Sequence, residues 1–211
     1  LLGVADSVLS SVHDMVTSIF TKGSEAATGT ATAQDRATIA MEIRGVRDQL
    51  FAMANTMARG RYLFAGSKVT AAPFSISGDT VTYQGDQEIN KITIADGLDI
   101  KAGVFVGDVF SPIFQTISAL LAAVDGNDAS AIKTVLPGFE PALSGVNQAR
   151  GQLGAGLRQL QGIGTELDAQ ESNLRARQSS LEDTDLAQAV TRLEQLQTAI
   201  KATLTVHSTT Q

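Results

Sequence analysis

The most constraining feature of the sequence is a leucine that returns every seventh residue in its C-terminal half. Val146 begins this series, which continues through Leu153, Leu160, Leu167, Leu174 and Leu181. A seven-residue recurrence keeps these side chains on one stripe of a helix, as in a coiled coil. No proline follows Pro141, so we expect a continuous helix from Leu143 to Leu181, about 58 Å long at 1.5 Å per residue.

The positions that complete the apolar ladder change along this helix. They start with Leu157 and Gly164 but become Glu171 and Gln178. The C-terminal part of the helix should therefore meet a wetter or intermolecular surface, because its stripe is only partly apolar. Elsewhere we expect the leucines to pack inside the chain rather than in a dimerising zipper, since other helices carry matching stripes and no basic region adjoins the ladder.

Two amphipathic helices are predicted ahead of the ladder. The first follows from apolar residues between Val8 and Ile19 and should end near residues 21–23. The second keeps a four-three rhythm from Ile39 to Met57, with N-cap candidates at residues 32–35 and Gly60 as the closing glycine. We expect the two to form an antiparallel hairpin.

The periodicity changes from helix to strand after Gly60. Alternating segments flank Gly78-Asp79, and a second pair of apolar segments flanks Asp96-Gly97, a strong hairpin dipeptide. We therefore expect a β-rich domain over 61–107 and a discontinuous helical rod domain made of 1–60 and 108–211. The insert is too small to be stable alone. We expect it to share the core of the rod, yet to be removable without loss of the helices.

Helical periodicity resumes at Ser111-Pro112, where Ser would be the N-cap and Pro the first helical residue. Asp128 is the predicted N-cap of a short helix that ends near residue 136. Later, Asp185 and Gln188 have capping-box spacing within an acidic segment, so we expect the rod to kink or restart there. Its apolar stripe then continues through Leu186, Val190, Leu193, Leu196, Ile200 and Leu204.

Composition opposes catalytic, metal-binding and nucleic-acid-binding functions. There is no Cys, and the only histidines are His13 and His207, so neither a His-based triad nor a Cys or two-His metal site has support. The acidic segment lacks the spacing of a calcium loop. A net charge of -6 without clustered Lys and Arg opposes phosphate binding, and no apolar run reaches the ~20 residues that span a bilayer. We predict no catalytic, cofactor-binding or metal residues, and no nucleic-acid or membrane partner.

The order of these parts and two motifs resemble the bacterial flagellar hook-associated proteins of the flagellin-like superfamily. The first motif comprises Gly60, Arg61, Tyr62, Leu63, Phe64, Ala65 and Gly66. The second lies in the acidic segment and includes Asp183 and Asp185. The first motif is the discriminating one, because flagellin usually lacks it, whereas the second is shared across the superfamily.

This resemblance implies a mainly α fold with a β insert (α+β), in which an elongated flagellin-like helical bundle or coiled coil carries a small outer β domain. It implies a secreted, extracellular, non-enzymatic subunit of the flagellum that joins hook-associated proteins at the hook end to the flagellin filament. Its helical packing or assembly interface would comprise Leu153, Leu160, Leu167, Leu174, Leu181, Leu186, Val190 and Leu193.

The same resemblance implies the partners. These are neighbouring copies in a ring, the other hook-associated proteins, flagellin, and a flagellar export chaperone that would bind terminal segments missing from this sequence, which we expect to be trimmed at both ends. No cofactor is implied. Two alternatives stay open: a flagellin filament subunit, and a surface recognition or adhesion module on a helical stalk. Tyr62 and Tyr83 would make a poor sugar platform for the latter.

Overall fold

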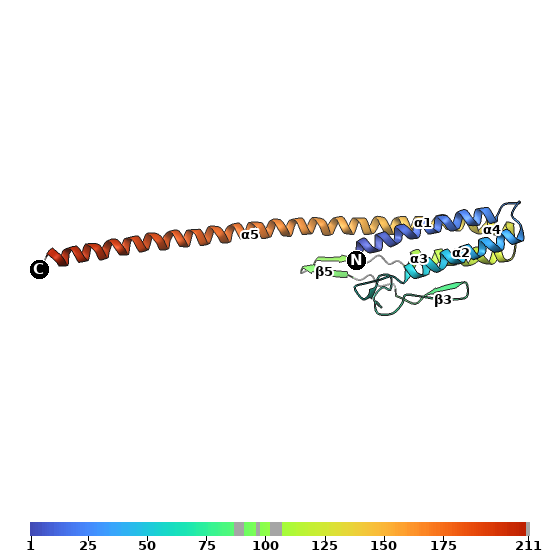
Figure 1. Ribbon diagram of the computed structural model, residues 1–211, viewed down its shortest axis with the longest axis horizontal. Helices are drawn as coiled ribbons and strands as arrows, with labels where there is room; N and C mark the ends of the chain where they lie inside the picture. Colours follow the sequence, from blue (N-terminus) through green and yellow to red (C-terminus); the bar gives the residue numbers. More distant parts are fainter. Residues whose placement is uncertain (87–90, 96–97, 102–106, 210–211) are drawn as a thin grey trace. The chain divides into compact units, whose positions relative to one another are not determined.

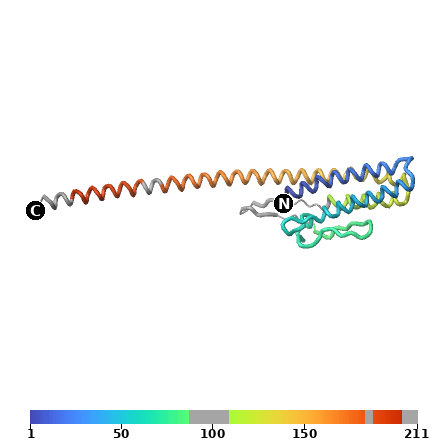
Figure 2. The backbone as a smooth tube through the Cα atoms, viewed as in Figure 1, coloured from blue at the N-terminus to red at the C-terminus, as the bar shows by residue number. Residues whose placement is uncertain are grey.

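The computed structural model of the chain describes residues 1–86, 91–95, 98–101 and 107–209, and it describes side chains for 1–86, 109–182 and 187–202. Across these residues the fold is mainly α-helical with three small antiparallel β-hairpins (Figure 1). The predicted class, mainly α with a β insert, is therefore confirmed. By its contacts the chain divides into two compact units, residues 1–159 and 160–211, whose backbone is traced in Figure 2.

Helices α1 (Leu2–Ala26) and α2 (Ala33–Ala54) pack as the predicted antiparallel pair. A capping box begins α2: Asp35 N donates to Thr32 Oγ1 at 3.2 Å, and Thr32 N donates to Asp35 Oδ2 at 2.9 Å. This reciprocal pairing satisfies two backbone donors that a helix N-terminus otherwise leaves unpaired, so the predicted N-cap region is confirmed.

The predicted end of α2 was wrong. The helix stops at Ala54, and Met57 lies in strand β1 (Met57–Ala58), which pairs with β2 (Arg61–Tyr62). The cause is Asn55, whose side chain accepts from Phe74 N and donates to Phe74 O, both at 3.0 Å. This pairing turns the chain out of the helix, and Gly60 serves the following turn at φ +75°.

Helices α3 and α5 begin earlier than predicted. Helix α3 (Gly107–Asp125) contains Pro112 inside it rather than at its first position. Val109 and Phe110 are buried, and their packing outweighs the backbone bond that proline removes. Helix α4 (Ala129–Val135) is capped as predicted by Asp128, whose Oδ1 accepts from two backbone N–H groups. The 3-10 turn η1 (Leu136–Gly138) then leads into α5 (Phe139–Thr209).

Both predicted hairpins of the insert are present. Strands β3 (Phe74–Ser77) and β4 (Thr80–Tyr83) pair across a turn that holds Gly78 at φ +60°. Strands β5 (Lys91–Ala95) and β6 (Leu98–Lys101) form the second hairpin. The strand residues predicted at 104–106 lie outside the described residues.

A cluster of aromatic rings joins the first part of the insert to the helices. Phe74 lies 5.5 Å from Phe110 and 5.7 Å from Phe114 between ring centroids, and Phe64 lies 5.2 Å from Phe110. All four rings are almost fully buried. The insert therefore shares the core, as predicted. The same burial opposes the expectation that the insert could be removed without loss of the helices, because two of these rings come from it.

Candidate assembly surface

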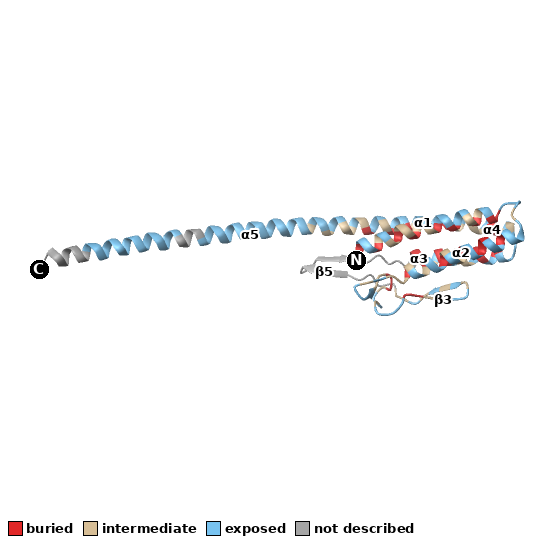
Figure 3. Ribbon diagram, in the orientation of Figure 1, coloured by how far each residue is buried: buried red, intermediate tan, exposed pale blue. Residues whose placement is uncertain are grey.

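The heptad stripe of α5 changes from buried to exposed along the helix (Figure 3). Its first turns pack into the first unit, where Phe139, Val146 and Leu153 are at most 2% exposed. Phe139 meets Phe20 of α1 edge to face, with ring centroids 6.4 Å apart. Arg150 donates to Asp6 Oδ1 at 3.1 Å, so α5 is fixed to α1 by an ion pair as well as by apolar contact.

Beyond this packed start, the exposed fraction of the predicted interface residues rises as far as Leu181. Leu160 is half-buried, and the exposed fraction reaches 52% at Leu167, 66% at Leu174 and 69% at Leu181. Val190 is 50% exposed and Leu193 is 56% exposed. The side chain of Leu186 lies outside the described residues. The expectation that the ladder packs inside the chain is thus wrong beyond Leu160 for the side chains that the structure describes. The expectation of an intermolecular surface fits this exposure.

Helix α5 runs without interruption through the acidic segment, so the predicted kink or restart is absent. What changes there is the phase of the apolar stripe. At about 100° per residue, Leu181 lies only about 20° around the helix from Leu174, whereas Leu193 lies about 120° from Leu181. The stripe therefore moves to another face near Asp183 and Asp185, whose side chains lie outside those described. The acidic motif marks a change of face rather than a cap.

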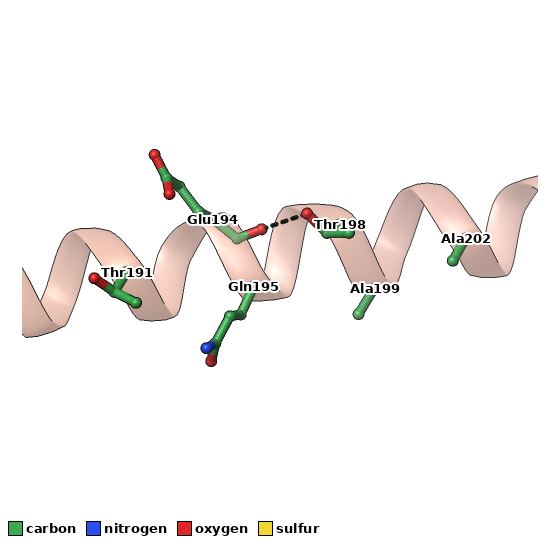
Figure 4. A pocket seen from close by; sticks show the side chains of 6 residues that line it. All are labelled: Thr191, Glu194, Gln195, Thr198, Ala199 and Ala202. Carbon is green, nitrogen blue, oxygen red and sulfur yellow. Dashed lines mark hydrogen bonds between the residues drawn. The ribbon is translucent and has the colours of Figure 1, made fainter.

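Small and polar side chains lie on the face of α5 opposite the second stripe. Thr191, Gln195, Thr198 and Ala202 lie along one side of α5, where Thr198 Oγ1 donates to Glu194 O at 2.8 Å (Figure 4). All these residues belong to a single helix, so the hollow between them is the shallow groove of a helix surface and encloses no ligand. Such a groove suits the close approach of another helix.

The discriminating motif around Gly60 to Gly66 has a structural role. Phe64 and Ala65 are buried, and Gly66 has φ +64° with a hypothetical Cβ only 2.2 Å from Asp86 Oδ1. Asp86 accepts from Ser67 N at 2.7 Å, and Tyr83 Oη donates to Asp86 O at 2.7 Å. Residues 66–67, at the end of this motif, are therefore held against residues 83–86, and glycine is required at position 66 where the two segments approach.

Sequence reasoning missed two arginines on the buried face of α2. Arg36 is 8% exposed, and its guanidinium donates to Ala26 O at 2.9 Å, Thr28 O at 3.2 Å and Asn127 Oδ1 at 2.6 Å. It thereby satisfies carbonyls at the end of α1. Both arginines fall on the four-three spacing of the apolar stripe, so the spacing itself indicates that they lie on the buried face.

The second arginine, Arg47, anchors the β3–β4 turn to α2. Arg47 and Arg44 both donate to the carboxylate of Asp79, Arg44 through two bonds of 2.9 and 3.1 Å, and Arg44 also pairs with Asp125 at the end of α3. The hydrogen bonds from Arg44, and secondarily those from Arg47, hold the pKa of Asp79 below its usual range. The hairpin is thus fastened to two helices by charge-assisted bonds.

Neither a metal centre nor a membrane span is found in the part of the chain that the structure describes. No group of three or more His, Asp or Glu side chains gathers there as a metal site would require. His13 lies beside Asp14, with Nδ1 and Oδ1 3.5 Å apart, and His207 has no described side chain. None of the helices searched is both long and apolar enough to cross a bilayer.

Comparison with known proteins identifies relatives over most of the chain. The family model for the bacterial flagellin N-terminal helical region matches residues 1–69, and that for the C-terminal helical region matches residues 136–211. Together these regions span more than half of the sequence. They are the regions that contribute α1, α2 and α5 to the fold.

Individual relatives are hook-associated proteins. The chain is 29% identical to flagellar hook-associated protein 3 of Salmonella typhimurium over 95% of this chain and 72% of that protein, and 36% identical to the Escherichia coli protein of the same name over 64% of this chain and 40% of that one. The crystal structure of FlgL from Bacillus cereus superposes with a TM-score of 0.72, at 24% identity, over 82% of this chain and 85% of the other. The chain therefore belongs to the flagellin-like superfamily, as a relative of its flagellar hook-associated proteins.

Proposed function

We propose that this chain is a structural subunit of the bacterial flagellum that joins the hook-associated proteins at the hook end to the flagellin filament. The observation that carries the proposal is the exposed apolar stripe of α5 in a chain related to hook-associated protein 3. Large aliphatic side chains at regular helical spacing are costly to leave in water and are typical of surfaces that bind other helices.

The size of this surface favours assembly among several neighbours. Seven large aliphatic residues of α5 beyond Leu160 are about half exposed or more: Leu167, Leu174, Leu181, Val190, Leu193, Leu196 and Ile200. Full burial of such a side chain contributes about 1.5–3 kcal/mol, so covering the remaining halves would contribute roughly 5–10 kcal/mol. Association of two molecules costs on the order of 4–15 kcal/mol. One contact would be weak, and contacts with several neighbours would be stable.

The change of stripe face near Asp183 fits this arrangement. A helix that offers two differently directed stripes can contact two neighbours, as a closed ring of copies requires. Flagellin, the other hook-associated proteins and a flagellar export chaperone are further proposed partners. We also propose that the protein is secreted and acts outside the cell without enzymatic activity, with residues 1–60 and 108–211 as its helical rod domain and 61–107 as its outer β domain.

A complementation experiment tests this function. In a strain that lacks the gene, we expect the wild-type gene to restore filaments and swimming. Leu174→Glu should fail, because it places a charge on the stripe, whereas Ser172→Glu should succeed, because Ser172 is exposed about 160° around the helix from Leu174. Normal filaments with Leu174→Glu would contradict the proposed role of the stripe.

A filament subunit is the second candidate, because the matching family models describe flagellin regions. The position of a tagged chain distinguishes the two. We expect label confined to the base of the filament, next to the hook, and label along the whole filament would favour a flagellin. Label on the cell surface without any filament would favour the recognition module.

A further inference from the structure

The β3–β4 hairpin is held to the helices of the first unit in two different ways. Its base is held by apolar packing, because Phe74 is 2% exposed and its ring lies against those of Phe110 and Phe114. The side chain of Asn55 also bonds both the N–H and the carbonyl group of Phe74. The base is therefore fixed to α2 and α3 by contacts that involve no charged group.

The tip of the hairpin, residues 76–81, is held mainly by charge. Most of its residues are exposed. Among the side chains that the structure describes, Asp79 is the only one of the tip that bonds to a helix. Its carboxylate accepts two bonds from Arg44 of α2, at 2.9 and 3.1 Å, and another from Arg47. Charge-assisted bonds are stronger than bonds between neutral groups, so the position of the tip depends on this one carboxylate.

The hairpin covers a buried cation. Arg47 is 6% exposed, and its guanidinium also donates to the carbonyl of Gly78 in the turn at 3.4 Å. A buried charge is costly unless carboxylates compensate it, and Arg47 bonds two of them, Asp48 and Asp79. Without the charge of Asp79, the closed hairpin would keep Arg47 from water with only one carboxylate left. Lifting the tip would then be favoured, because it hydrates the guanidinium.

We propose that the β3–β4 hairpin is a strap that opens about its base, and that the bonds from Arg44 and Arg47 to Asp79 keep it closed. Opening exposes Arg47 together with the inner face of the hairpin, where Ile76 and Val81 pair across the two strands. The helices keep their packing, because the rings at the base stay buried. Such an opening is local and needs less free energy than unfolding of the whole unit.

Thiol labelling of single cysteines tests the opening, because the chain has no Cys. The probe is Val81→Cys in the full chain, since Val81 is half-buried on the inner face of the hairpin. Thr82→Cys is the matched control, because Thr82 is exposed on the other face and should be labelled rapidly in every background. Val16→Cys is the second control. Val16 is 0% exposed in α1, so its labelling reports loosening of the helices themselves.

Removal of the charge should open the strap and leave the helices closed. Adding Asp79→Asn should speed the labelling of Val81→Cys about tenfold, and Arg44→Gln should speed it as well, whereas Val16→Cys should stay slow in both backgrounds. Sodium chloride at about 1 M should speed the labelling of Val81→Cys when Asp79 is present, and have little further effect with Asp79→Asn. Unchanged labelling of Val81→Cys in both variants would overturn the inference. Equal acceleration of Val16→Cys would overturn it too, because the whole unit would then loosen.

Discussion

A matched pair of substitutions, Leu153→Ala and Leu174→Ala, tests where α5 stops packing in the free chain. Both leucines belong to one heptad series on one helix, but Leu153 is 2% exposed and Leu174 is 66% exposed. The chemistry of the two changes is identical, and alanine is a good helix former at both positions. Any difference between them therefore measures burial.

The expected magnitudes follow from that burial. Truncating a buried leucine to alanine costs about 2–5 kcal/mol, since both transfer energy and a cavity contribute. Truncating a leucine that is already exposed to water removes little buried apolar surface. Leu174→Ala should therefore change the free energy of unfolding by less than about 0.5 kcal/mol. Leu160 is half-buried, so Leu160→Ala should destabilise the chain by an amount between those of the other two variants. This loss is smaller than the full cost of a buried leucine, which its place in the heptad alone would predict.

Urea unfolding of the isolated chain provides the assay. Tyr62 and Tyr83 are the only tyrosines, and the chain has no Trp, so near-ultraviolet circular dichroism or tyrosine fluorescence reports on the first unit, where both lie. Far-ultraviolet circular dichroism reports on the helices. Equal losses for the two variants would mean that the exposed stripe is covered in the free chain, and the reasoning about assembly would be refuted.

Three further predictions concern the first unit. Gly66→Ala should destabilise by roughly 2 kcal/mol or more, since it adds a clash to a positive φ, whereas Gly78→Ala, with a similar φ and open space, should cost only about 1–2 kcal/mol in urea melts. Arg36→Met should cost about 1.5–3 kcal/mol because it leaves buried carbonyls without donors, and an unchanged midpoint would contradict the role assigned to that arginine. The hydrogen bonds that lower the pKa of Asp79 stabilise the fold at pH values above the ordinary carboxyl pKa. This stabilisation is lost as the pH falls through the lower pKa that Asp79 has in the folded protein. The Asp79→Asn variant should therefore be less stable than the wild type at pH 7. The difference in their free energies of unfolding should become smaller toward pH 2.

Heptad spacing and turn dipeptides were sufficient to predict the helices, two of the three hairpins and the caps at Thr32 and Asp128. They failed where a long-range polar contact decides a boundary. Asn55 ends α2 by pairing with the backbone of Phe74, and nothing local to Asn55 announces that partner. The spacing puts Arg36 on the buried face of α2, but only the fold brings together the carbonyl groups to which its guanidinium donates.

The sequence was sufficient to predict which residues form the apolar stripe of α5, but not which helix covers it. The weakening ladder after Leu167 indicated an incomplete interior stripe. Spacing alone could not say whether a helix of the same chain or another molecule covers it, because both need the same heptads. The change of face near Asp183 was legible in the spacing from Leu181 to Leu193. A capping-box spacing coincides with this change of face, and that spacing predicts a restart of the helix that the structure does not show.

The most direct test of the central claim is amide hydrogen exchange across α5 in the free protein and in assembled hook–filament junctions. In the free protein we expect slow exchange for residues 139–153, which are packed, and fast exchange for residues 160–202, since a helix without tertiary contacts is marginally stable in water. In the assembled state residues 160–202 should exchange about tenfold more slowly or better, with little change over 139–153. Protection of residues 160–202 already in the free protein, or no gain of protection on assembly, would contradict the account.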